Sequence, residues 1–204
     1  MSKAEDIIFK IITIGDSGVG KTSILKRYVY NSYNINSLAT VGVNFSFKDV
    51  VLKNGTKVQL KLIDTAGQEK YKSLAKTYYK NTEGVLFVFS FDDKKSFDNI
   101  TNWIDEFKEN NGNENIPTLL IGNKSDVPKK EVDQESINKL LSQHKMKYIE
   151  SSALNNENID QIFDDLSERM YIYSKSISKN KQQGKTLAKF EQKKKISCLL
   201  CRAD

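Results

Sequence analysis

The sequence contains very few cysteines and no long apolar segment. Its two cysteines, Cys198 and Cys201, lie near the end of the chain, so we expect no disulfide framework and a reducing, cytosolic setting. No apolar run approaches the roughly 18 residues that a membrane-spanning helix needs. The first six residues, MSKAED, are polar and acidic, which argues against a secretory signal. These absences favour a cytosolic protein of ordinary globular type.

The positive charge of the chain is concentrated in one region. Residues 174–204 carry nine Lys or Arg against two Asp or Glu, a net charge of +7, whereas residues 1–173 carry 23 against 24, a net charge of −1. A nucleic-acid-binding fold needs a basic face on its folded body, and this body is neutral, so we expect no nucleic-acid partner. We predict one domain over residues 1–174 and a flexible basic tail over residues 175–204.

Residues 15–22, GDSGVGKT, fit the phosphate-binding pattern G-x-x-x-x-G-K-[ST]. The glycines allow a tight turn whose N–H groups face an anion, and the helix that follows adds a positive N-terminus. Lys21 then places a charge on the β- and γ-phosphates, and the Thr22 hydroxyl is an oxygen ligand for Mg²⁺. The alternative is a glycine-rich turn with a chance Lys-Thr. A strand-like run before the motif and a helix-like run after it favour the phosphate loop.

The chain as a whole alternates strand-like and helix-like segments. The predicted strands are Ile7–Ile14, Val43–Leu52, Lys57–Ile63, Gly84–Phe91, Thr118–Gly122 and Lys147–Ser151. The predicted helices are Thr22–Tyr30, Glu69–Lys80, Ser96–Asn110, Asp133–His144 and Ile159–Ser174. Because Asn54-Gly55 favours a tight hairpin, the second and third strands should be antiparallel. The alternation predicts an α/β fold with a mostly parallel six-stranded sheet, one antiparallel edge strand and helices on both faces. Ligands of such sheets bind at the carboxyl ends of the strands.

The second motif, DTAGQE, begins at Asp64 on the end of a predicted strand. Asp64 can hold Mg²⁺ opposite Thr22, directly or through a water. Gly67 has no side chain to block its N–H from a terminal phosphate. Gln68 carries a donor and an acceptor, which suits it to orient an attacking water. Although a D-x-x-G pattern is common by chance, its place on a strand end after the phosphate loop supports this role.

The third motif, Asn123-Lys124-Ser125-Asp126, follows the strand Thr118–Gly122 and indicates the base. The Asp126 carboxylate can accept from the N1–H and the 2-amino group of guanine together, whereas adenine offers no such pair. Asn123 can tie this loop to the phosphate loop, and the Lys124 stem can cover one face of the base. Taken singly, the motif would be a solvated turn; the other two motifs in the right order favour guanine recognition. Two further segments complete the predicted base site: a backbone N–H of Ser152, Ala153 or Leu154 for the guanine O6, and Tyr33 at the base edge.

With these motifs in place, residues 7 to about 174 resemble the small GTPases of the Ras superfamily, and among them the Rab branch. The Rab likeness rests on residues 40–45 (TVGVNF), 70–74 (KYKSL) and 78–80 (YYK), together with the paired cysteines near the end. The resemblance implies a P-loop NTPase small G domain with GTP or GDP and Mg²⁺ as ligands. It implies nucleotide contacts at Asp16, Ser17, Gly18, Val19, Gly20, Lys21, Thr22, Ser23, Tyr33, Thr40, Gly67, Asn123, Lys124, Asp126, Ser152, Ala153 and Leu154.

The resemblance also implies a molecular switch that hydrolyses GTP to GDP and phosphate, slowly without an activating protein. Gln68, Lys21 and Thr40 would be the catalytic residues, and Thr40 would join Thr22 and Asp64 at Mg²⁺ only in the GTP state. Effectors, an exchange factor and a GTPase-activating protein would bind Thr40–Phe45 and Gly67–Tyr79. The process controlled would be vesicle-mediated membrane traffic on the cytosolic face of an endomembrane, with a GDP-dissociation inhibitor and the prenylation machinery as further partners.

The chain departs from the Rab pattern at several positions. Ile63 replaces the Trp that usually precedes the Asp-Thr-Ala-Gly motif, so effector choice cannot be carried over from a particular Rab. The cysteines stand as C-L-L-C-R-A-D rather than adjacent or nearly so, and the ending is a poor C-a-a-X match. A zinc site is disfavoured because His144 is the only histidine and no second cysteine pair exists. Lipid attachment at Cys198 or Cys201, supported by the basic tail, is the favoured interpretation.

Two other function classes can be weighed against the switch. A guanine-nucleotide-binding scaffold with little hydrolysis would act through constant partner binding, but it has no need of the complete set Lys21, Thr22, Thr40, Asp64 and Gln68. A P-loop kinase would need an acceptor site, and no lid or second basic cluster is evident in the body of the sequence. The sequence therefore favours an active GTPase switch.

Overall fold

The computed structural model describes residues 7–35, 40–65, 72–113 and 115–178. Six strands form one sheet in the order β2-β3-β1-β4-β5-β6. Their bounds are β1 Ile7–Ile14, β2 Val43–Val51, β3 Lys57–Thr65, β4 Gly84–Ser90, β5 Thr118–Asn123 and β6 Lys147–Glu150. All neighbouring pairs are parallel except β2 with β3, which lies at the edge. The predicted fold class is confirmed.

The β2–β3 hairpin turns where the sequence predicts. Gly55 has φ +81°, and its N–H donates to the carbonyl of Leu52 at 2.8 Å. The side chain of Asn54 accepts from the backbone N–H of Thr56 at 3.0 Å, which stabilises the turn. Because the turn fixes the register, Phe45 on β2 is paired with Ile63 on β3.

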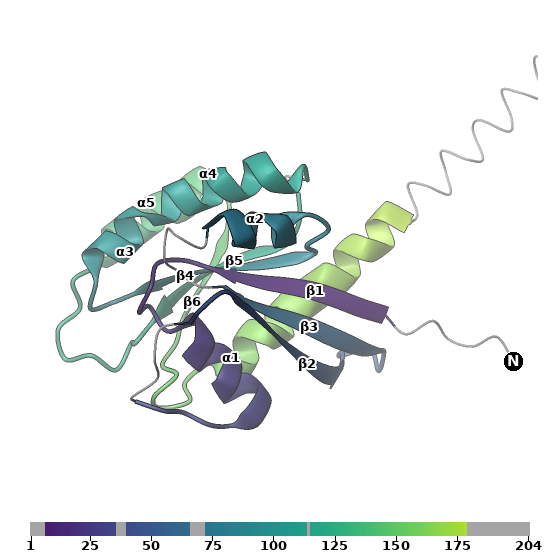
Figure 1. Ribbon diagram of the computed structural model, residues 1–204, viewed down its shortest axis with the longest axis horizontal. Coiled ribbons are helices and arrows are strands. Elements are labelled where there is room, and N and C mark those ends of the chain that lie inside the picture. The colour runs from purple at the N-terminus through teal and green to yellow at the C-terminus, as the bar shows by residue number, and fades with distance from the viewer. Residues whose placement is uncertain (1–6, 36–39, 66–71, 114, 179–204) are drawn as a thin grey trace, which may run out of the picture. The chain divides into compact units, whose positions relative to one another are not determined.

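Helices cover both faces of the sheet (Figure 1). The bounds are α1 Lys21–Tyr30, α2 Lys72–Tyr79, α3 Lys94–Asp98, α4 Ile100–Asn111 and α5 Gln134–His144. Helices α2 to α5 lie on one face, and α1 lies on the other together with a helix that begins at residue 159. The start predicted for α2, Glu69, lies outside the described residues. The last helix continues to residue 178, beyond the predicted end at Ser174.

The single helix predicted over Ser96–Asn110 is wrong. The structure has two helices there, which meet at Asn99. The carboxylate of Asp93 accepts from the backbone N–H of Ser96 at 3.2 Å and starts α3 early. The side chain of Asn99 donates to Asp16 at 2.6 Å, and this long-range hydrogen bond fixes the residue at the junction of the two helices.

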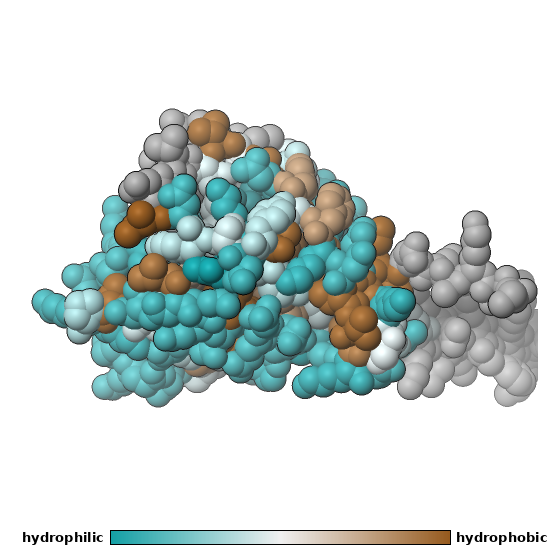
Figure 2. Space-filling model, turned by 90° about the horizontal axis from the view of Figure 1, so that it is seen from below, coloured by the Kyte–Doolittle hydropathy of each residue, from teal (hydrophilic) through white to brown (hydrophobic). Residues whose placement is uncertain are grey.

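The core lies on both faces of the central strands. Every residue of β4 is buried, as are Ile11 and Ile12 on β1. A strand covered on both faces must be apolar throughout, and the GVLFVFS sequence of β4 meets that requirement. On the outside, apolar residues appear as separate patches on a largely hydrophilic face (Figure 2). Phe45, Phe47 and Val51 on the edge strand β2 are among the large apolar side chains that remain exposed.

The chain divides into two units, Met1–Met170 and Tyr171–Asp204. The first contains the sheet and all of the helices named above up to residue 170. In the described part of the second, residues 171–178 are helical. Within the described ranges, no helix combines the length and the apolar character that a membrane crossing requires.

Candidate functional site

The N-terminus of α1 is shaped by Gly20. This residue has φ +96° and occupies the N-cap position without any side chain to bond the first N–H groups of the helix. A Cβ at Gly20 would lie 2.2 Å from Nδ2 of Asn123, so both the backbone angle and the close approach require glycine. The helix therefore offers its N-terminal dipole and its unpaired N–H groups to an anion.

Lys21 is buried beneath the phosphate loop. Its Nζ donates to the carbonyls of Gly15, at 2.8 Å, and Asp16, at 2.6 Å. Burial lowers the pKa of Lys21 to about 8, against the attraction of Asp64 and Asp16. A buried ammonium bonded mainly to neutral carbonyls is the electrostatic complement of a phosphate chain.

Three side-chain oxygens meet beside Lys21. Oγ1 of Thr22 lies 2.6 Å from Oγ1 of Thr40 and 2.7 Å from Oδ2 of Asp64. The other carboxylate oxygen of Asp64, Oδ1, is buried and has no hydrogen-bond partner among the described residues. Burial raises the pKa of Asp64, while the Thr22 hydrogen bond and the charge of Lys21 lower it.

This oxygen cluster fits a hard divalent cation. A buried carboxylate oxygen without a partner is unfavourable, and two hydroxyls with one carboxylate are ligands of the kind that Mg²⁺ prefers. Thr22, Thr40 and Asp64 are the three metal ligands that the sequence predicts, and the structure brings them together.

Asn123 connects its own segment, residues 123–126, to the phosphate loop, a link that the sequence predicts. It is almost fully buried, and its Nδ2 donates to the carbonyl of Val19 at 2.8 Å. Its Oδ1 accepts from the backbone N–H of Ala153 and the hydroxyl of Ser151, both at 3.3 Å. A single amide thus holds three segments that are far apart in the sequence.

Asp126 and Ser152 face one another at the other end of the site. The Ser152 hydroxyl donates to Oδ1 of Asp126, which orients the carboxylate. Nearby, Nζ of Lys124 pairs with both carboxylate oxygens of Asp92, at 3.0 and 3.2 Å, so its aliphatic stem is held in place. The arrangement presents a fixed carboxylate beside an apolar stem, which suits a planar base with two adjacent donors.

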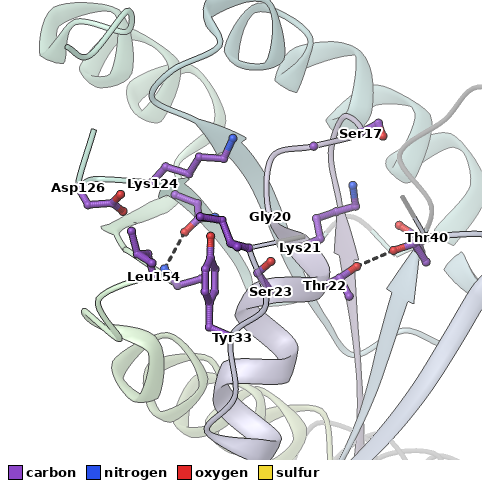
Figure 3. A pocket seen from close by; sticks show the side chains of 15 residues that line it. Ser17, Gly20, Lys21, Thr22, Ser23, Tyr33, Thr40, Lys124, Asp126 and Leu154 are labelled. Atoms are coloured by element: carbon purple, nitrogen blue, oxygen red, sulfur yellow. Dashed lines mark hydrogen bonds between the residues drawn. The ribbon is translucent and has the colours of Figure 1, made fainter. Parts of the chain in front are cut away.

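The two ends form one cavity of about 330 Å³. It is lined by Ser17, Gly18, Gly20, Lys21, Thr22, Ser23, Tyr33, Ile35, Thr40, Thr65, Asn123, Lys124, Asp126, Ala153 and Leu154. Figure 3 shows Tyr33, Lys124, Asp126 and Leu154 toward one end and Ser17, Lys21, Thr22 and Thr40 toward the other. The residues predicted to contact the base and those predicted to contact the phosphates therefore lie toward opposite ends of one cavity.

The remaining predicted residues, apart from Asp16, fall in two groups. Val19, Asp64 and Ser152 lie behind the lining and act on it through the hydrogen bonds given above. Gly67 and Gln68, together with Cys198 and Cys201, lie outside the described residues. Ile35 and Thr65 line the cavity without having been predicted. Thr65 directly follows Asp64, a predicted metal ligand, but Ile35 lies in a polar stretch without any motif to mark it.

Asp16 has a role that sequence reasoning missed. Its carboxylate accepts from Nδ2 of Asn99 at 2.6 Å and from Nε1 of Trp103 at 2.7 Å, while its carbonyl accepts from Lys21. The phosphate loop is therefore clamped to the start of α4. The only signal in the sequence is an indole N–H at a buried helical position, which needs a partner.

The arrangement can be compared with known proteins. A model of the Ras family matches residues 10–172. The chain belongs to the Ras family. This family member is 36% identical to the Ras-related protein Rab-13 of Canis lupus familiaris over 204 residues, which covers 98% of the chain and all of the relative. It is 40% identical to Rab-11B of Dictyostelium discoideum over 177 residues, covering 86% and 78%. It is 34% identical to Rab-8A of Rattus norvegicus over 206 residues, covering 98% and 99%.

As a Ras-family member, the chain is a Rab-like small GTPase that acts in membrane traffic. It binds GTP and GDP with Mg²⁺ and hydrolyses GTP, and it has regulators and effectors in general. The scaffold alternative is not favoured. The prediction of a Rab-like GTPase is confirmed, while the roles of individual residues stay predictions.

Proposed function

We propose that the cavity holds the nucleotide with its phosphates over the N-terminus of α1 and its guanine at Asp126. The observation that carries the proposal is the meeting of the Thr22 and Thr40 hydroxyls with the Asp64 carboxylate. Lys21 then contacts the β- and γ-phosphates, and backbone N–H groups of residues 16–20, with Ser23, complete the phosphate site. Mg²⁺, when bound, neutralises the charge that develops on the β- and γ-phosphate oxygens.

On the base side, Asp126 accepts from the N1–H and 2-amino groups of guanine. The hydrogen bond from Ser152 holds the carboxylate in the orientation that this pairing needs. A backbone N–H of residues 152–154 meets O6, and Lys124 and Tyr33 cover the ring. An adenine base would leave the carboxylate without donors in a desolvated site, which makes the choice of base strict.

Hydrolysis depends on Gln68 and Thr40. We infer that the Gln68 amide orients the attacking water through one donor and one acceptor, rather than removing its proton. Thr40 reaches the γ-phosphate in the GTP state, as its contact with the Thr22 hydroxyl supports. Loss of the γ-phosphate releases Thr40, so the chain carries one surface with GTP and another with GDP.

Effectors and regulators bind the segments Thr40–Phe45 and Gly67–Tyr79. Phe45 is 42% exposed and packs edge-on against Tyr78, with 5.3 Å between the ring centroids. Ile63, paired with Phe45 across the hairpin, is fully buried. The effector surface therefore offers two aromatic rings and no third one at Ile63, so effector choice is not carried over from relatives with Trp there.

The domain consists of residues 1–174, and residues 175–204 form a basic tail that anchors it. Prenylation of at least one of Cys198 and Cys201 supplies a lipid, and the cluster Lys193-Lys194-Lys195 adds about 1 kcal/mol per lysine on an anionic leaflet. A GDP-dissociation inhibitor extracts the lipidated GDP form. The protein thus cycles between the cytosol and the cytosolic face of an endomembrane.

The test is single-turnover hydrolysis of GTP with an activating protein present. Intrinsic rates in this superfamily are only on the order of 10⁻⁴–10⁻² s⁻¹, so the stimulated rate is the informative one. Gln68→Leu should keep GTP affinity and lose most of the stimulated rate. An unchanged stimulated rate would remove the assigned role of Gln68.

A further inference from the structure

Arg27 makes contacts that no motif marks. It lies in the last turn of α1, and its guanidinium donates from Nε to the carbonyl of Ala153 at 3.0 Å. Nη2, on the same edge of the guanidinium plane, donates to the carbonyl of Leu154 at 3.1 Å. Ala153 and Leu154 both line the base end of the cavity. One side chain therefore donates hydrogen bonds to two consecutive peptides of the base site from outside the cavity.

The opposite edge of the same guanidinium holds the segment that follows α1. Nη1 donates to the carbonyl of Asn31 at 3.2 Å, and Asn31 caps the helix with φ +48°. Two residues later, Tyr33 enters the cavity lining, and the Cζ atom of Arg27 lies 5.7 Å from the centroid of its ring. Arg27 thus fixes the distance between the two segments that lie on either side of a bound base.

Apart from Arg27, the loop 152–157 is held mainly at its two ends. Ser152 and Glu157 exchange two backbone hydrogen bonds, of 3.2 and 2.9 Å, which close the loop 152–157. Asn123 reaches the N–H of Ala153 at a longer 3.3 Å. Leu154 is 46% exposed, so packing alone gives this peptide little restraint. The charged hydrogen bonds of Arg27 are the strongest contacts on this side of the loop.

We propose that Arg27 is a positioning residue that sets selectivity for the guanine O6 and slows release of the nucleotide. The inference rests on the proposed function, in which a backbone N–H of residues 152–154 meets O6. Arg27 fixes the carbonyl of Ala153, which shares a peptide with the N–H of Leu154, and the next carbonyl, that of Leu154. It thereby keeps this stretch of backbone, with its N–H groups, at bonding distance from O6, and it holds Tyr33 against the ring edge. The planar guanidinium can donate to carbonyls on both of its edges at once. A lysine ammonium lacks this geometry, so Lys cannot fully replace Arg27.

The experiment compares GDP with 6-thio-GDP, which carries sulfur, a weaker hydrogen-bond acceptor, in place of O6. Dissociation constants are measured by displacement of fluorescent GDP from the full chain with Mg²⁺. Arg27→Met keeps the length of the stem without its donors. It should weaken GDP about tenfold and 6-thio-GDP about threefold, so the preference for GDP falls about threefold. Arg27→Lys should lie between Arg27→Met and wild type.

Arg169 provides a matched control. Its Nη1 also donates to a backbone carbonyl, that of Thr118 at 2.9 Å, but at the start of β5 and away from the cavity. Arg169→Met should lower the unfolding midpoint and leave the preference for GDP over 6-thio-GDP unchanged. If Arg27→Met behaves in the same way, Arg27 only stabilises the fold and the inference is overturned.

The outcomes separate this inference from the proposed function. If wild-type protein binds ADP as tightly as GDP, the proposed base site itself fails. If wild type prefers GDP but the preference over 6-thio-GDP is the same in wild type, Arg27→Lys and Arg27→Met, only the positioning role fails. Should Arg27→Met not fold, the ratio for Arg27→Lys decides: a value equal to that of wild type overturns the role.

Discussion

Replacing Asn123 by Ala should strongly accelerate release of GDP. The amide joins the phosphate loop at Val19, the strand end at Ser151 and the base loop at Ala153. Alanine can make none of these hydrogen bonds, and it creates space next to Gly20, whose Cα lies against the amide. The substitution therefore loosens the phosphate end and the base end of the cavity together.

The size of the effect follows from the burial and length of these bonds. The hydrogen bond to Val19 is short, at 2.8 Å, and lies in a buried site, whereas the two bonds accepted by Oδ1 are longer, at 3.3 Å. Leaving buried donors and acceptors without this partner costs about 1.5–3 kcal/mol in total. That range corresponds to about a 10–150-fold loss of GDP affinity, carried mainly by the dissociation rate.

The assay is dissociation of fluorescent GDP in excess unlabelled GDP at fixed Mg²⁺. Asn138→Ala is the control. Asn138 lies exposed on α5, and its side chain accepts a hydrogen bond from Gln134 on the surface of the same helix. The control should dissociate GDP at the wild-type rate. If Asn123→Ala also releases GDP within about twofold of the wild-type rate, the Asn123 amide does not hold the two ends of the site together.

Three further outcomes are expected. Trp103→Phe removes the indole donor to Asp16 and should speed GDP release about fivefold at unchanged base preference; an unchanged rate would show that the clamp is unimportant. Thr22→Ala should raise the Mg²⁺ concentration needed to retain GDP about tenfold or more, as a chelator titration measures. The Cys198→Ser/Cys201→Ser double variant should move from the membrane to the cytosolic fraction, with intact mass reporting the lipid; retention on membranes would place the anchor elsewhere.

The parts of the site that could be predicted are those that a local pattern determines. A mostly apolar run predicts β1 with its exact bounds, and Asn54-Gly55 predicts the hairpin. Parallel strands bring their carboxyl ends to one edge, so polar residues at the ends of different strands, such as Asp64 and Asn123, could be placed in one site before any contact was known.

The parts that could not be predicted depend on partners far away in the chain. The helical period runs through Asn99 without interruption, and the division there accompanies a hydrogen bond to Asp16, 83 residues earlier. Arg27 looks like an ordinary basic residue in the last turn of a helix, yet its acceptor at Ala153 lies 126 residues away. The pattern of a single sequence does not reveal such long-range hydrogen-bonded pairs, because neither residue type nor spacing specifies them.

The guanine site is tested most directly by competition among nucleotides for the wild-type cavity and for that of Asp126→Asn. GTP and ATP, with XTP as the third competitor, are titrated against fluorescent GDP. We expect GTP to displace the probe from wild type and ATP not to. Asp126→Asn should lower GTP affinity about 10–150-fold while XTP gains, because the amide can donate to the 2-oxo group of xanthine. Wild-type protein that bound ATP as tightly as GTP would contradict the guanine site.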